Sequence, residues 1–189
     1  TLFTEYFHGK KAGDEYNYGL RKNIKNDIPV IGTYGVNQEG SGDMYPKGAN
    51  LIHSIRHAIN NDSLFRNILI GLNKQFYHQT VTTEQVENYI SVRAGFGFQK
   101  VFDQYLRTTQ IPVLNYSYNE KEKIFTYEYK NCVTGFNLPL HFSYLGKKYS
   151  FMPMDYQPQQ RLIQEPNFNL QDFVKTIESQ YYIQLAEVK

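Results

Sequence analysis

The chain has 189 residues with 41% hydrophobic and 16% aromatic side chains, enough to bury a substantial core as one or two domains. Its formal net charge is only +2 and no basic block stands out, which argues against nucleic acid as the main partner. No apolar run approaches the roughly 18 residues expected of a membrane-spanning segment. The single cysteine excludes an intrachain disulfide and leaves the cellular compartment open.

The first part of the chain is predicted to be helical. An apolar stripe at helical spacing starts at Leu2 and resumes after Gly13. The stripe begins without an N-cap signal, which suggests that the chain is a piece of something longer. Residues 27–43 contain one proline and four glycines and are expected to form a long irregular loop. The next helix opens at Pro46, since proline is favoured at the first helical position.

Three further helices are expected before residue 110. Asp62 can cap the first of them. Residues 82–85, Thr-Thr-Glu-Gln, fit a capping box for the second, which should end at Gly95. The third carries an apolar stripe from Phe98 to Leu106. Short helices joined by short loops therefore describe this region.

The pattern changes to a period of two after Pro112. Alternating apolar and polar residues, with turn signals between them, predict strands at 123–131, 138–146, 149–154 and 181–188. The Gly-Lys-Lys-Tyr stretch that begins at Gly146 is expected to hold a turn, and residues 168–178 fit either a helix or a strand.

We therefore predict an α+β protein in two parts. Residues 1–111 form an all-α helical part, and residues 112–189 form a small antiparallel immunoglobulin-like β-sandwich.

His53 and His57 lie one helical turn apart, which is a spacing that metal ligands use. A zinc-peptidase helix also needs a glutamate directly after the first histidine, and Ser54 occupies that position. The guanidinium of Arg56 would be unfavourable beside a cation. The pair is therefore interpreted as structural, with His53 half-buried and hydrogen-bonded to the backbone, and no metal ligand is assigned in this chain.

Two candidate nucleophiles are discounted. Cys132 has no diagnostic flanking sequence and is expected to be a small packed residue on a strand. Ser41 lies between two glycines, but it lacks the preceding hydrophobic strand that a nucleophile elbow needs.

Three residues around the long loop are candidates for a site. Glu39 and Asp43 flank the loop glycines and could hold a substrate amine, or they could simply be solvated. Tyr45 precedes Pro46 at the positive end of a helix dipole, where a phenol can donate a hydrogen bond to a developing oxyanion. Position alone does not distinguish Tyr45 from a packing tyrosine.

Several stretches together resemble zinc aminopeptidases of the aminopeptidase N family, the gluzincin metallopeptidases. "DMYPKGANLIHSIRHAINND", "LNKQFYHQTVTTEQVENYI" and "FDQYLRTTQIPVLNY" are similar to the later part of the catalytic domain. "FTYEYKNCVTGFNLPLHF" is similar to the small β-sandwich domain that follows it. The resemblance covers most of residues 15–155.

The resemblance implies a role for Tyr45. In this family a tyrosine ahead of a Lys-Gly-Ala helix points into the active site and stabilises the tetrahedral intermediate opposite zinc. Gly48 and Ala49 are then expected to let the helix pack closely against its neighbours. His53 and His57 fall on a packing helix rather than on the zinc helix.

The chain also departs from the family. The zinc motif His-Glu-x-x-His and the exopeptidase loop Gly-x-Met-Glu-Asn are absent. The resemblance implies that Thr1 follows the helix that carries the glutamate zinc ligand. In the complete protein, zinc would polarise the scissile carbonyl, an upstream glutamate would take the proton of the bound water, and Tyr45 would stabilise the oxyanion.

The expected function is therefore that of the C-terminal segment of a zinc-dependent aminopeptidase-like hydrolase that removes N-terminal residues from peptides. The segment itself is expected to bind no zinc and to be inactive. The alternative is a non-catalytic binding or scaffold protein derived from the same family. Self-association is expected through an apolar truncation surface around Leu2, Phe3, Phe7 and the Leu51 face of its helix.

Overall fold

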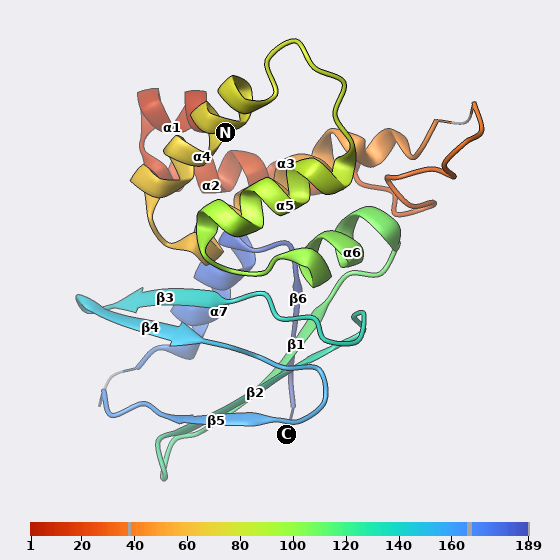
Figure 1. Cartoon of the computed structure of the whole chain (residues 1–189). Coiled ribbons are helices and arrows are strands. Elements are labelled where there is room, and N and C mark those ends of the chain that lie inside the picture. Colours follow the sequence, from red (N-terminus) through yellow and green to blue (C-terminus); the bar gives the residue numbers. More distant parts are fainter. Residues whose placement is uncertain (38, 166–167, 189) are drawn as a thin grey trace.

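The computed structural model describes residues 1–37, 39–165 and 168–188, and it has a helical layer stacked on strands (Figure 1). The helical layer contains α1 (Leu2–His8), α2 (Lys10–Gly19), the 3-10 turns η1 (Leu20–Asn23) and η2 (Gly42–Met44), α3 (Pro46–Ile59), α4 (Asp62–Gln75), α5 (Thr83–Ala94) and α6 (Gln99–Arg107). The second part contains β1 (Val113–Asn119), β2 (Ile124–Lys130), β3 (Leu140–Tyr144), β4 (Lys147–Phe151), β5 (Gln159–Leu162), α7 (Leu170–Gln180) and β6 (Gln184–Glu187). The predicted α+β class, helices first and strands after, is confirmed.

The first helical segment breaks earlier than the sequence suggested. Gly9, with a φ of 85°, separates α1 from α2. Gly13 instead lies inside α2, where an added Cβ would come within 3.0 Å of the Glu5 Cβ. The missing side chain at Gly13 therefore lets α1 and α2 pack closely.

The cap signals are confirmed in two helices and shifted by one residue in a third. Pro46 is the first residue of α3. The capping box of α5 is complete, because Thr82 and Gln85 each accept the other's backbone N–H. Asn61, and not Asp62, caps α4 by accepting a backbone N–H of the first turn through its side-chain oxygen.

The strands form two sheets, one of them mixed. The larger sheet has the order β5-β2-β1-β6, and β3 pairs only with β4. β2 runs antiparallel to β1 and β5, whereas β6 runs parallel to β1, with Val113 opposite Gln184. The prediction of a purely antiparallel arrangement was wrong for this pair, because α7 carries the chain back to the end of the sheet at which β1 starts.

The strand boundaries also differ from the prediction in detail. Leu145 and Gly146 have φ of 48° and 78°, as a two-residue type I′ hairpin turn requires, so β4 begins at Lys147. β1 and β5 were not among the strands predicted from the sequence.

Aromatic rings fill the space between the two sheets. The ring centroids of Phe125 on β2 and Phe151 on β4 lie 5.4 Å apart. Phe173 of α7 lies 4.9 Å from Phe125 and 5.6 Å from Phe151. All three side chains are buried. The segment left open between helix and strand is therefore a helix that supplies part of the core.

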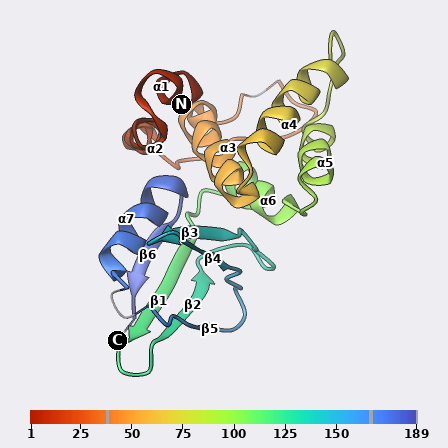
Figure 2. The same ribbon diagram turned by 90° about the vertical axis from the view of Figure 1, so that its left-hand side faces the viewer.

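The helical layer and the strands share one hydrophobic core, and hydrogen bonds connect them. The Tyr105 hydroxyl donates to the Tyr182 carbonyl at 2.6 Å, and the Tyr182 amide donates to the Ser54 hydroxyl at 2.9 Å. His141 Nε2 lies 3.0 Å from the Ala58 carbonyl oxygen. Figure 2 shows α7 next to α2 and below α3 at this junction. The division into two domains stays a prediction.

Arg21 ties the end of α7 to the helical layer. Its Nη1 and Nη2 donate to the carbonyls of Glu178 and Tyr181 at 2.6 and 2.9 Å, and its Nε donates to Asn50 Oδ1 at 2.8 Å. Burial lowers the pKa of the guanidinium, but an arginine stays charged in proteins. Its charge faces the negative end of the α7 dipole.

The expected truncation surface is only partly exposed. Phe3 and Phe7 are 76% and 60% exposed and Leu2 is half-exposed, whereas Leu51 is buried in the core. The expectation was therefore wrong for the Leu51 face, because the rest of the chain covers it. Self-association stays a prediction.

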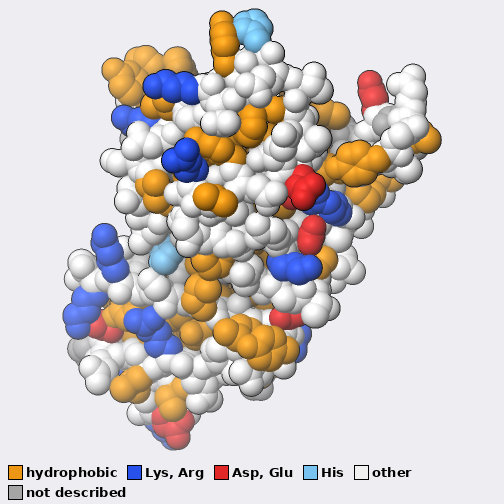
Figure 3. All heavy atoms as spheres, in the orientation of Figure 1, with side chains coloured by type: hydrophobic (Ala, Val, Ile, Leu, Met, Phe, Trp, Pro, Cys, Tyr) orange, Lys and Arg blue, Asp and Glu red, His pale blue; other side chains and the backbone are white. Residues whose placement is uncertain are grey.

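The charged side chains do not gather into a single patch on the face shown in Figure 3, where Lys and Arg are interspersed with Asp and Glu. Among the helices of the described residues, none combines the length and the apolar character needed to cross a membrane.

The first prediction concerns Arg21. Arg21→Ala should lower the free energy of unfolding by about 2–4 kcal/mol, because the carbonyls at the end of α7 lose their charged donor. Arg21→Lys should be intermediate, since one ammonium cannot reach all three acceptors. Urea unfolding followed by circular dichroism measures both. The matched control, exposed Lys22→Ala, should stay within about 0.5 kcal/mol of wild type. Equal stability of the two alanine variants would contradict the role of Arg21.

The second prediction concerns His141, whose Nδ1 lies 2.9 Å from Ser150 Oγ. Burial lowers the pKa of His141, and the hydrogen bond to Ala58 only partly offsets this. The unfolded chain therefore takes up the proton first, and stability should fall as pH drops below about 6.5. Unfolding curves from pH 8 to 5 should show a shallower fall for His141→Gln, with His8→Gln as control. Parallel curves for wild type and His141→Gln would refute the prediction.

Candidate functional site

Tyr45 stands at the amino end of α3 with its side chain 79% exposed. Pro46 follows it as the first helical residue, and the Tyr45 carbonyl accepts the amide of Ala49 at 2.9 Å, which closes the first turn. The phenol is thus attached to the rigid end of a helix, beside the positive end of the helix dipole. Its accessibility suits a group that donates a hydrogen bond to a bound molecule.

Asp43 is buried directly before this helix and has a structural task. Its carboxylate accepts the amide of Lys25 at 2.9 and 3.1 Å and the amide of Asn26 at 2.7 Å. The Ser41 hydroxyl accepts the Asp43 amide at 3.1 Å and donates to Asp27 at 3.1 Å. These bonds hold the loop against the start of α3 and use the oxygens that a substrate amine would need. The substrate role of Asp43 stays a prediction.

Glu39 lies in the same loop but is exposed, so the loop does not bring it into the same environment as Asp43. At the next residue, Gly40, the end of the loop packs against the backbone of its beginning at Val30. A Cβ on Gly40 would lie 1.9 Å from the Val30 carbonyl oxygen, so only glycine fits there. The Ile31 amide donates to a carbonyl of α6 at 3.0 Å and anchors the loop to the helical layer.

The Lys-Gly-Ala segment after Tyr45 has two different environments. Lys47 is buried, and its Nζ donates to the Thr108 carbonyl at 2.9 Å. Burial lowers the pKa of Lys47, and the nearby Asp43 carboxylate acts against this. Gly48 and Ala49, expected to sit in close helix contacts, instead line an open groove of about 520 Å³ between α1, α3 and α4.

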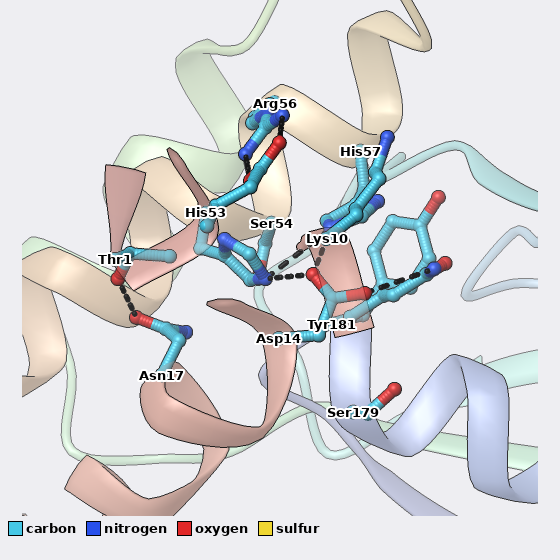
Figure 4. Close-up of polar contacts among 12 residues, drawn as sticks. Thr1, Lys10, Asp14, Asn17, His53, Ser54, Arg56, His57, Ser179 and Tyr181 are labelled. Atoms are coloured by element: carbon cyan, nitrogen blue, oxygen red, sulfur yellow. Dashed lines mark hydrogen bonds and ion pairs between the residues drawn. The ribbon is translucent and has the colours of Figure 1, made fainter. Parts of the chain in front are cut away.

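A second polar group lies farther along α3, where Asp14 of α2 meets His53 and His57 (Figure 4). Asp14 Oδ1 is 3.0 Å from the Nε2 of each histidine, and the two Nε2 atoms are 3.2 Å apart. All three residues are buried, with at most 7% of their surface exposed. A set of two imidazoles and one carboxylate can hold a metal ion.

The electrostatics of this group favour an ionised carboxylate and a neutral imidazole. Burial alone would raise the pKa of Asp14, but the hydrogen bonds from His53 and His57 hold that pKa well below its usual range. Burial lowers the pKa of His57. Gln180 of α7 donates to the other Asp14 oxygen at 3.4 Å.

The structure corrects two expectations about the histidine pair. His53 is 4% exposed, not half-buried, and its Nε2 contacts the Asp14 carboxylate and His57 rather than a backbone group. The guanidinium of Arg56 is held by Glu5 and Asp62 at 2.8 Å each, and Figure 4 shows it apart from the Asp14 carboxylate. The sequence did not reveal Asp14, because a polar residue on another helix carries no local signal.

Cys132 follows β2 instead of lying on a strand, and it is half-buried. Burial, with the Asp155 charge adding to it, raises the pKa of its thiol to about 11. Such a shift disfavours the reactive thiolate, in keeping with the interpretation that Cys132 is no nucleophile.

The role of Asp43 can be tested by removing its charge. Asp43→Asn should lower the free energy of unfolding by about 1–3 kcal/mol, because the backbone amides lose their charged acceptor. The matched variant in the same loop, Glu39→Gln, should change it by less than about 0.5 kcal/mol. Urea unfolding measures both. Unchanged stability of Asp43→Asn would instead favour a free, substrate-binding carboxylate.

Comparison with solved structures relates the fold to an aminopeptidase. The chain is similar to the crystal structure of Legionella pneumophila aminopeptidase A in complex with aspartic acid, with 13% sequence identity and a TM-score of 0.54. The match covers 100% of this chain and 23% of that protein's chain. No protein-family model and no curated protein sequence matches the chain. The chain therefore has a fold similar to part of an aminopeptidase structure.

Proposed function

We propose that this chain is the later part of the catalytic domain of a zinc aminopeptidase-like hydrolase, together with the β-sandwich domain that follows it. In this proposal, Tyr45 donates its phenolic hydrogen bond to the oxyanion that forms when the peptide carbonyl is attacked. The substrate is a peptide from which an N-terminal residue is removed. The fold similarity to an aminopeptidase structure supports the class of protein.

The exposure of Tyr45 is the observation that carries the proposal. The phenol is 79% exposed on the residue that immediately precedes α3, whereas Lys47 in the first turn of that helix is buried. A donor held in a fixed position before the reaction needs no reorganisation when charge develops on the substrate. The positive end of the α3 dipole adds to the stabilisation of an anion at this place.

The zinc of the proposed complete protein does not fit residues of this chain. The His-Glu-x-x-His motif is absent from the sequence. Among the described residues, Asp14, His53 and His57 form the group that could hold a metal ion, and this group is buried. It is also far from Tyr45, because His53 lies eight residues farther along the chain, which is about 12 Å along a helix. The zinc would therefore be held by residues outside this chain, and this chain alone is expected to be inactive.

Glu39 is the remaining candidate for contact with the substrate. Its carboxylate is exposed in the loop that leads into α3 and is accessible to a substrate amine, whereas that of Asp43 is occupied by backbone amides. We therefore assign amine binding to Glu39 in preference to Asp43.

The decisive experiment uses the complete protein that contains this chain. Tyr45→Phe removes one hydroxyl and keeps the ring, so kcat should fall about 10²–10³-fold while KM stays nearly constant. The matched control is Tyr77→Phe, because Tyr77 is 71% exposed and lies just beyond α4. Hydrolysis of aminoacyl p-nitroanilides measures both variants.

Wild-type kcat in Tyr45→Phe would refute the assigned role of Tyr45. A complete protein without His-Glu-x-x-His and without turnover would instead favour the alternative, a non-catalytic binding or scaffold protein of the same fold.

A further inference from the structure

The hydrogen bonds among Asp14, His53 and His57 are crowded. The three distances of 3.0, 3.0 and 3.2 Å form a nearly equilateral triangle, so two Nε2–H groups would approach Oδ1 only about 60° apart. The lone-pair directions of a carboxylate oxygen are much farther apart than that. Protons alone therefore satisfy this arrangement poorly, although all three side chains are buried.

We propose that Asp14 Oδ1, His53 Nε2 and His57 Nε2 bind one zinc-class divalent ion that joins α2 to α3. With metal–ligand bonds of about 2.0–2.2 Å, neighbouring ligand atoms of a tetrahedral zinc centre lie about 3.3 Å apart. The three atoms would have to move apart by only a few tenths of an ångström. A single cation would then replace the crowded protons and satisfy all three ligand atoms together.

The surroundings supply the support that a metal site needs. Gln180 donates to the second oxygen of Asp14 and orients the carboxylate, as outer hydrogen bonds do at metal centres. His57 packs against the ring of Tyr181, with centroids 5.9 Å apart. Asp14 also borders a cleft of about 580 Å³ between α2 and α7 that is open to solvent. The proposal does not depend on the proposed peptidase activity, because it concerns only residues of this chain.

The test uses the tag-free 189-residue chain after removal of metals with EDTA. Calorimetric titration should show one equivalent of Zn²⁺, and Co²⁺ should give the visible absorption of a four-coordinate site with nitrogen and oxygen ligands. Zn²⁺ at a hundredfold excess over its Kd should raise Tm by about 5–10 °C. Absence of stoichiometric binding, or an unchanged Tm, would show that the group is a hydrogen-bonded contact only.

Variants separate this site from adventitious binding. Asp14→Asn keeps the shape and one acceptor oxygen but removes the charge, so Zn²⁺ affinity should fall at least about 100-fold, and His57→Gln should behave alike. The control is the exposed histidine variant His78→Asn, which should bind as wild type does. Equal affinity in Asp14→Asn and wild type, or equal loss in His78→Asn, would overturn the proposal. If His57→Gln fails to fold, Asp14→Asn and the Co²⁺ spectrum of wild type decide.

Discussion

The arrangement of the whole chain depends on a face of α3 whose buried side chains are polar. Asn50, His53, Ser54 and His57 follow one another at intervals of one helical turn or less, and none is more than 7% exposed. Burying such groups is costly unless each finds a partner. Only segments with complementary groups can therefore cover this face. α2 supplies Asp14, η1 supplies a guanidinium, and the chain after α7 supplies a backbone amide.

This constraint also explains the mixed sheet. The segment after α7 is fixed to the helical layer, because Tyr182 is bonded to Ser54 of α3 and to Tyr105 of α6. β6 must therefore start at the helical layer, and β1 starts there too, directly after α6. Both strands run away from the helices in the same direction (Figure 1), and they pair in parallel from Val113 and Gln184 onward.

The features that could be predicted from the sequence are those whose signal lies within a few neighbouring residues. Pro46 and the Thr82–Gln85 box act within one helical turn, and both were predicted correctly. The polar face of α3 was missed, because polar residues at helical spacing look the same whether they face water or a partner. Asp14 gave no signal at all. β5, with the sequence Gln-Gln-Arg-Leu, is a strand only because it pairs with β2.

The buried face also bears on the proposed role of Tyr45. An oxyanion donor is effective only when its position is set before the substrate arrives. α3 sets the backbone position of Tyr45, because the partners of the polar face hold the helix along most of its length. Asp43 completes the arrangement by fixing the loop that precedes Tyr45. The side chains that hold the helix are thus buried, while the phenol at its end remains accessible, and this separation is what a preorganised site requires.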